Sequence, residues 1–248
     1  MRRMTWVFVI INLALILIMV KAGLWQLDRA AQKQHIASQL AQADTTLQQW
    51  SQVTQLEKLN AQYQTVALTG ALDIEHAMLL DNKVWQGQVG YHVVVPLVQG
   101  SNAILVNLGW VAQGESRQQL PSLAELQHWL DERSFTGRLK WPEAGFQLAK
   151  QPLAQVFPQR LQYLPMAQLQ QMFAQQHLHL MAPVLRLDPD TDVGFVRQWQ
   201  WLTMPAAKHT AYAWQWFTMA FVLAIVASVF IRQQRLPRGE QGCKKVVH

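Results

Sequence analysis

The sequence has little charge and a single cysteine. Charged residues make up 15% of its 248 residues, against about 25% in ordinary soluble proteins. Such a deficit indicates membrane segments. The one cysteine, Cys243, lies near the C-terminus. An internal disulfide is therefore excluded, and so are CxxC motifs for copper or thiol exchange and the CxxCH motif for covalent haem.

The local signatures of common enzymes are also missing. The sequence contains no GxSxG, GxxxxGK[ST] or HExxH motif and no GxGxxG that opens a helix. We therefore predict that the protein is not an enzyme. An exported enzyme tethered by its two ends stays an alternative, and it would need carboxylates clustered with His92 in a polar pocket.

Two long apolar runs stand at the ends of the chain. Residues 4–20 carry no charge and extend to Leu24 if Lys21 reaches the interface, while residues 210–231 form 22 uncharged residues. About 20 residues at 1.5 Å each cross the hydrocarbon core of a bilayer. The predicted segments are a cytoplasmic start (1–3), a first span (4–24), an extracytoplasmic domain (25–208), a second span (209–231) and a cytoplasmic basic tail (232–248).

The positive charge lies at the ends of the chain. Residues 28–208 hold 13 basic and 14 acidic residues, so the net charge of +6 comes from the flanks of the two spans. Basic flanks tend to stay in the cytoplasm, which predicts a membrane protein with both termini cytoplasmic, in contact with lipid and not with nucleic acid. The alternative is that the first run is a signal peptide cleaved near Ala22.

The middle of the chain is rich in strand signals. We expect a membrane protein of the α+β class, in which two transmembrane helices flank a β-rich, partly barrel-like domain with a few short helices. Pro96 predicts that its strand lies at an edge or is interrupted there. The expected strands are 63–72, 77–81, 90–98, 103–112, 134–141, 184–187 and 196–202, with turns at 81–83 and 99–102; the expected helices run to about Ala43 and over 121–131 and 165–176, with helix or loop over 44–62.

Polar and aromatic residues gather where the second span begins. On a helix, His209, Tyr212, Ala213 and Trp216 form one stripe, and Gln215 lies beside it. Neutral imidazole at this boundary can bind a metal or haem iron. An ordinary aromatic belt with one solvated interfacial histidine is the competing interpretation.

The end of the first span also carries polar and aromatic residues, like the start of the second span. Gln26, Arg29 and Lys33 share one helix face, Trp25 is placed for the aromatic belt, and Gly23 allows another helix to approach closely. A helix that simply emerges from the membrane into water would explain most of this pattern.

The remaining polar candidates are weaker. His92 and Asn107 are predicted to face water from their strands or to pair across the hairpin that 90–98 and 103–112 form. His177 and His179 are spaced to chelate a metal from a strand, but the sequence offers no third ligand.

Four stretches together resemble the surfeit locus protein 1 family, including its Shy-type bacterial members. They are Gly23-x-Trp25-Gln26-x-x-Arg29-x-x-x-Lys33, then GYHVVVPL from Gly90, then VNLGWV from Val106, and His209-x-x-Tyr212-Ala213-x-x-Trp216-Phe217. Their order around one domain between two spans carries the resemblance.

The resemblance implies an assembly factor for haem-copper terminal oxidases. It implies binding of haem a and its delivery to the catalytic subunit of cytochrome c oxidase, with haem-synthesis proteins as further partners. His209 is then the candidate iron ligand, and Tyr212, Gln215, Trp216, Trp25, Gln26 and Arg29 are the other candidate haem contacts, Arg29 or Lys33 meeting a propionate. A membrane scaffold that stabilises an oxidase intermediate without binding haem is the alternative.

Overall fold

The computed structural model divides the chain into two compact units. It describes residues 2–42, 47–56, 62–114, 117, 119–129, 131–142, 153–154, 156–201 and 203–235. One unit consists of residues 1–38 and 201–248, and the other of residues 39–200. The expectations for Ala43, residues 44–46 and 57–61, Leu202 and the basic tail beyond Arg235 lie outside the described residues.

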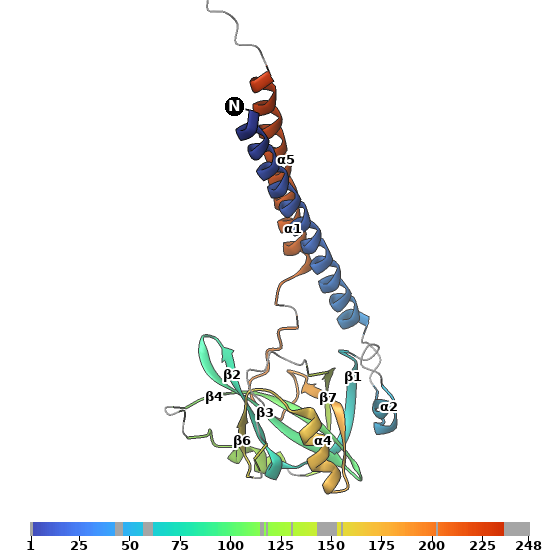
Figure 1. Ribbon diagram of the computed structural model, residues 1–248. Coiled ribbons are helices and arrows are strands. Elements are labelled where there is room, and N and C mark those ends of the chain that lie inside the picture. The colour runs from blue at the N-terminus through green and yellow to red at the C-terminus, as the bar shows by residue number, and fades with distance from the viewer. Residues whose placement is uncertain are drawn as a thin grey trace, which may run out of the picture. The chain divides into compact units, whose positions relative to one another are not determined.

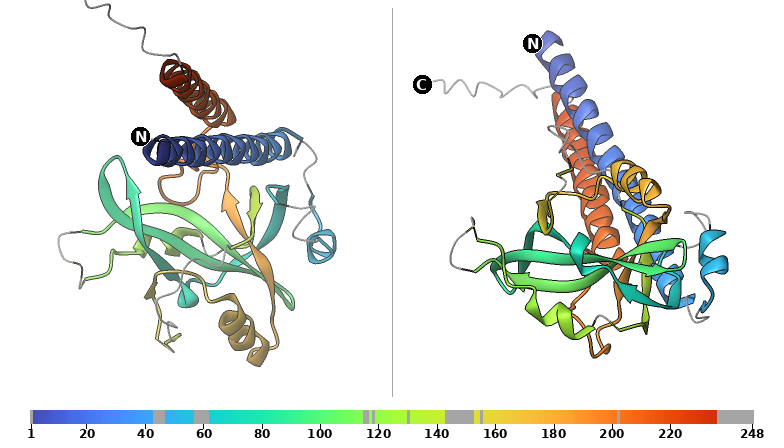
Figure 2. Two further views of the ribbon diagram at one scale, coloured as in Figure 1. Left: turned by 45° about the horizontal axis from the view of Figure 1, so that its top comes forward. Right: turned by 90° about the horizontal axis from the view of Figure 1, so that it is seen from below.

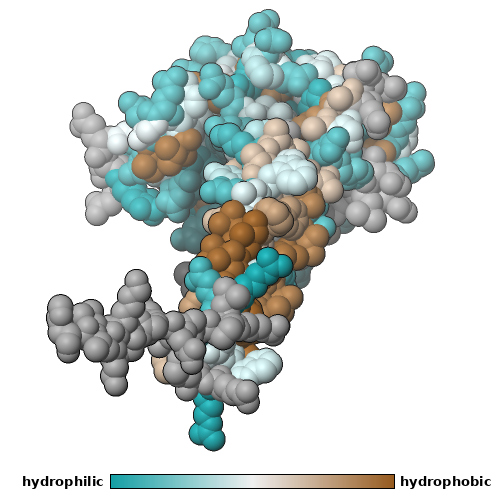
Figure 3. Space-filling model, turned by 90° about the horizontal axis from the view of Figure 1, so that it is seen from above, coloured by the Kyte–Doolittle hydropathy of each residue, from teal (hydrophilic) through white to brown (hydrophobic). Residues whose placement is uncertain are grey.

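The first unit is a pair of long helices, namely α1 (Arg2–Gln42) except for its last four residues, and all of α5 (Ala206–Arg235). They lie side by side and antiparallel, in dark blue and red in Figure 1. Both are long and apolar enough to cross a membrane. Hydrophobic residues gather on this helix pair in Figure 3. As predicted, α1 continues without a break through residue 24 and into the polar sequence that follows.

The second unit is built on seven strands (Figures 1 and 2). Five of them close into a barrel, because β1 pairs with β3 as well as with β5 and completes the ring β1-β5-β7-β4-β3. β2 and β6 extend the sheet beyond β3. The strands are β1 (Thr65–Leu72), β2 (Met78–Trp85), β3 (Gln88–Gln99), β4 (Asn102–Ala112), β5 (Arg133–Lys140), β6 (Gln159–Leu161) and β7 (His179–Leu187). The predicted barrel-like, β-rich domain is therefore confirmed.

Two apolar clusters hold this unit together. The strands alternate, so that Val93, Val106 and Leu185 face the large core inside the barrel. Their neighbours Val94, Leu105 and Val184 lie on the outer face, where α4 (Met166–Gln175) covers them with Leu169 and Phe173. Short helices complete the unit: α2 (Trp50–Thr54), η1 (Ile74–His76) and η2 (Ala124–Trp129).

Glycine is needed where β5 meets β7. Gly137 pairs with Leu187, and a Cβ at this position would lie 2.2 Å from the carbonyl oxygen of Arg186. Since real side chains do not approach so closely, only glycine lets these strands close the ring here.

Several sequence predictions about the strands are confirmed. β1, β5, α4 and the hairpin of β3 and β4 lie where expected, and the turn of that hairpin is Gly100–Ser101. β3 is not an edge strand, but its pairing is interrupted at Pro96. On one side its partner changes from β2 at Val94 to β1 at Leu97, so the missing N–H of proline is not required there.

Three predictions are wrong. Asp81, Asn82 and Lys83 do not form a turn, because the polar pair produces a bulge inside β2, with Asn82 at φ 58°. The chain turns instead at Gln86–Gly87, where both residues have positive φ, as a two-residue hairpin requires.

The other two wrong predictions concern 196–202 and 121–131. Val196 makes one isolated bridge to Trp110, and residues 197–200 have no regular structure, since Trp199 turns to hydrogen-bond Leu187. The expected helix at 121–131 is the short 3₁₀ helix η2. β7 also begins earlier than predicted, and β6 was not predicted because three residues give no periodicity.

Candidate functional site

The helix pair packs through small residues and aromatic rings. Near the two chain termini, the rings of Phe8 in α1 and Phe230 in α5 lie with centroids 4.4 Å apart. At the opposite end, the Phe217 ring lies directly on Gly23, where a Cβ would be 2.5 Å from the ring. The predicted close approach at Gly23 is therefore confirmed, and at this level the two helices are in direct contact.

One turn further along α1, the predicted residues Gln26 and His209 meet. His209 Nδ1 donates to Gln26 Oε1 across 2.8 Å. The His209 side chain is 9% exposed, and the adjacent Ala213 is fully buried. His209 is thus a packed interhelical group, unlike the solvated interfacial histidine that the competing interpretation expects.

This hydrogen bond sets the protonation of the imidazole. An amide oxygen only accepts, so Nδ1 carries the hydrogen and Nε2 keeps its lone pair. In the part of the chain that the structure describes, Nε2 has no hydrogen-bond partner, and it is not sealed from solvent. Ligating histidines in proteins are commonly held in this way, with the second ring nitrogen fixed by an oxygen.

The other predicted site residues surround this contact with more exposed surface. Tyr212 and Trp25 are 44% and 52% exposed, and Gln215 is exposed as well. The guanidinium of Arg29 lies 5.5 Å from the centre of the Trp25 ring and donates to Gln32. Trp216 is half-buried and Trp214 is exposed. The structure therefore brings His209 and Gln26 together, whereas in the part of the chain that it describes Arg29, Tyr212 and Gln215 make no hydrogen bond with either of them.

The predicted pairing of His92 and Asn107 across the hairpin is confirmed. Asn107 is buried, and its amide nitrogen lies 3.3 Å from His92 Nδ1. Burial and the nearby cations Lys83 and Arg186 lower the pKa of His92 to about 3. Sequence reasoning missed Arg186 because β7 is far from β3 in the chain, and it missed Lys83 because residues 81–83 were predicted to form a turn rather than part of β2, which pairs with β3.

The histidines at 177 and 179 are separated by the start of a strand. His177 lies in a turn with φ 60°, and His179 begins β7. Among the described residues, no three His, Cys, Asp or Glu side chains gather in a way that would hold a metal ion.

These features define a class of protein: a membrane protein in which two apolar helices flank a closed five-stranded barrel. The comparison with protein families then gives the particular family. The chain belongs to the SURF1 family, whose model matches residues 13–221. A comparison with curated proteins gave no match. The family is known for cytochrome oxidase assembly, so this chain is identified as a member of a family of assembly factors rather than of enzymes.

Proposed function

We propose that the protein binds haem a at the ends of α1 and α5 and delivers it to the catalytic subunit of a haem-copper oxidase. The observation that carries the proposal is the hydrogen bond between His209 Nδ1 and Gln26 Oε1. It leaves the Nε2 lone pair available on a histidine whose ring is held by packing.

The donor chemistry of these residues fits haem. Haem would supply an iron that takes an imidazole nitrogen as a ligand, and His209 Nε2 would hold it. Gln26 keeps the imidazole in the required tautomer and fixes its plane. Because Phe217 fills the space against Gly23, the porphyrin face would pack on the exposed side of the helix ends, where Trp25, Tyr212 and Trp216 offer aromatic surface.

The same surface offers a charged group and a polar group. Arg29 is exposed next to Trp25 and is suited to a propionate, since guanidinium pairs well with carboxylate. Gln215 is an exposed amide in an otherwise apolar stretch of α5, and it would serve a polar substituent of the porphyrin.

The cell should place the barrel outside the cytoplasm. We propose that the chain is an inner membrane protein of a bacterium, as in the Shy-type members that it resembles. The basic residues that flank the spans support an orientation with both termini in the cytoplasm. Alkaline phosphatase fused after Arg235 is expected to be inactive, and fused at Gly100 it is expected to be active. The reverse result would overturn the orientation.

The haem role is tested by producing the full chain in a host that makes haem a. We expect haem to copurify with the wild type at about one per chain and to be lost from His209→Ala. His35→Ala removes an exposed histidine of the same helix pair and is expected to keep the haem.

Oxidase activity in the same host separates the two candidate functions. Loss of haem from His209→Ala together with loss of oxidase activity supports delivery. A wild type that carries no haem yet restores oxidase activity in a deletion strain, with His209→Ala equally active, would replace haem delivery with the scaffold function.

A further inference from the structure

The hairpin of β2 and β3 ends in an uncharged tip, residues 84–89. Val84 and Val89 are paired directly across the two strands, and they are 65% and 48% exposed. Directly paired residues share one face of an antiparallel ladder. The turn is Gln86–Gly87, and a Cβ added at Gly87 would meet no atom of the described residues within 4 Å. The hairpin projects from the barrel in Figures 1 and 2, so its tip is open to its surroundings.

Exposed apolar side chains of this size are rare in the barrel unit. Among the described residues of 39–200, they are Val84, Val89, Val156 and Val196. Of these four, only Val84 and Val89 are partners on neighbouring strands. A single exposed valine needs no explanation, but two adjacent ones at the end of a projecting hairpin form one apolar surface.

The turn at the other end of β3 has the opposite character. β3 extends from Gln88 to Gln99, so about 37 Å of strand separates the two turns. The turn between β3 and β4 reads Gln-Gly-Ser-Asn over residues 99–102, which suits a turn in water. The two ends of one strand are therefore suited to different surroundings.

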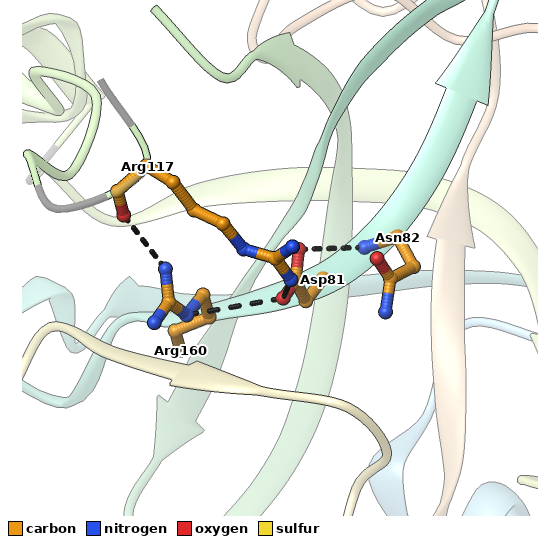
Figure 4. A network of polar contacts seen from close by, with 4 residues as sticks. All are labelled: Asp81, Asn82, Arg117 and Arg160. Atoms are coloured by element: carbon orange, nitrogen blue, oxygen red, sulfur yellow. Dashed lines mark hydrogen bonds and ion pairs between the residues drawn. The ribbon is translucent and has the colours of Figure 1, made fainter.

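The base of the hairpin is fixed by a buried carboxylate. Asp81, three positions before Val84, is 3% exposed and accepts from the backbone N–H of Asn82 at 2.8 Å. It also forms ion pairs with Arg117 at 2.6 Å and Arg160 at 3.8 Å, as Figure 4 shows. Charge-assisted bonds of this kind are stronger than neutral ones, so they hold the β2 bulge and the hairpin keeps a fixed direction from the barrel.

Trp85 braces one face of the tip. Its ring centroid lies 5.3 Å from that of Trp110, and Trp110 donates its indole N–H to the Lys83 carbonyl oxygen at 3.0 Å. The Trp85 indole N–H donates to Gln198 Oε1 at 3.4 Å. Since side chains alternate along a strand, the opposite face carries the two exposed valines.

The segment that Trp85 contacts leads directly into α5. Ala206, the first residue of α5, follows Gln198 by eight positions, which span at most about 28 Å of extended chain. α5 is long and apolar enough to cross a membrane, so a bilayer lies within reach of a hairpin that is bonded to Gln198. Tethering at this range gives a high effective concentration, and a weak attraction is then sufficient for binding.

The size and chemistry of the tip favour lipid over protein as its partner. A stable protein interface buries about 800 Å² on each side, which is far more than two valines offer. Shallow insertion at a bilayer surface needs only a small apolar area when the chain is already anchored. Tryptophan, which the tip contains at position 85, is enriched at membrane interfaces.

We infer that the hairpin tip, residues 84–89, is a membrane-binding element that inserts Val84 and Val89 into the interfacial layer of the bilayer. The insertion is shallow, because the backbone polar groups of the Gln86–Gly87 turn need water or headgroups as hydrogen-bond partners. It does not require anionic lipid, because the tip has no charge. The inserted tip holds the barrel against the membrane.

The test uses the full chain with Cys243→Ser in nanodiscs of zwitterionic lipid, with an environment-sensitive fluorophore on Gln86→Cys. Time-resolved emission gives the ratio of labels in lipid to labels in water, and lipids that carry a quencher near the headgroup report the depth. We expect most of the label at residue 86 to be in lipid. The same label on Ser101→Cys, in the turn at the other end of β3, is expected to be in water.

Replacement of the two valines tests whether they cause the insertion. Val84→Thr combined with Val89→Thr keeps the β-branched shape and should lower the ratio of lipid to water at residue 86 about tenfold. Val156→Thr changes an exposed valine outside the hairpin and should leave the ratio unchanged. A thermal unfolding scan of each variant confirms that the barrel is intact.

Three results would overturn the inference. The first is a label at residue 86 that is in water in nanodiscs and in native membranes. The second is a label that is in lipid to the same extent in the double threonine variant. The third is a label that is in water in nanodiscs but shielded in native membranes, which would make the partner a protein. None of these measurements involves haem, so the membrane-binding tip and the proposed haem function can fail separately.

Discussion

The helix pair and the barrel are stabilised in opposite ways. In the barrel, the buried residues are large and apolar, as Phe135 and Leu68 show. In the helix pair, the large apolar residues are exposed, whereas the buried ones are small or polar, such as Ala213, Asn12 and His209. The barrel is held by its own core, and the helix pair by close approach and by single hydrogen bonds in a surround of lipid.

Because of this difference, changes that affect stability and changes that affect the candidate site should fall in different parts of the molecule. A change in the barrel core should unfold a domain, while a change at the helix ends should leave the fold and alter one contact.

The largest effect is expected in the barrel core. Phe135→Ala removes a fully buried ring and should lower the free energy of unfolding by about 3–5 kcal/mol. Near-ultraviolet circular dichroism of the full chain in detergent, followed through denaturation, measures it. The control is Phe221→Ala, which removes an exposed phenylalanine of α5 and should leave barrel unfolding unchanged. Equal losses in both variants would contradict the separation.

The next effect is expected where the helices touch. Gly23→Leu forces the Phe217 ring away and should cost about 1–3 kcal/mol of helix pairing. Spin labels on cysteines placed at Lys21 and Met219, with Cys243 replaced by serine, should report a longer and broader distance. Ala31→Leu, at an exposed position of the same helix, should leave the distance unchanged. A Gly23→Leu distance equal to that of the wild type would show that Gly23 is not needed for packing.

The third effect is a pH dependence confined to the barrel. The pKa of His92 is about 3 in the folded protein and about 6.5 in an unfolded chain. Between these values the unfolded state binds the extra proton, so stability is complete above pH 6.5 and falls as the pH decreases. The slope from this one group is at most about 1.4 kcal/mol per pH unit. Denaturation at several pH values should show that the free energy of unfolding depends less on pH in His92→Gln than in the wild type. The same pH dependence in both proteins would contradict the lowered pKa of His92.

The smallest effect is expected at Arg117. Its side chain is 55% exposed, so Arg117→Ala should cost at most about 1 kcal/mol. Asp81 keeps Arg160 and the Asn82 backbone N–H. Chemical denaturation measures the change, and a loss above about 2 kcal/mol would mean that the ion pair is a main support of the β2 bulge.

Much of the fold could be predicted because its signals are local. The β3–β4 hairpin follows from two β-branched runs around a Gly-Ser turn, and the two membrane helices follow from long uncharged runs. The bulge at Asp81 was mistaken for a turn because Asp-Asn sequences favour both. The closure of β1 on β3 and the parallel pairing of β4 with β7 join distant segments, and no local pattern contains them.

The candidate site, too, could be predicted only where its signals are local. Helical spacing placed His209 and Gln26 each on a stripe of its own helix, but only the structure shows that they meet. Lys83 and Arg186 were not candidates in the sequence, since a lone lysine and a lone arginine on strands usually face water. Arg186 comes near His92 through the strand order, and Lys83 comes near it through the β2–β3 hairpin, which the sequence did not reveal because residues 81–83 resemble a turn.

The central claim is that Gln26 holds His209 ready to bind haem iron. The direct measurement is a titration of the purified, haem-free full chain in nanodiscs with haem a, followed by the Soret absorption. We expect one saturable site in the wild type, no comparable site in His209→Ala, and about 10–100-fold weaker binding in Gln26→Ala. Wild-type affinity in His209→Ala would contradict it.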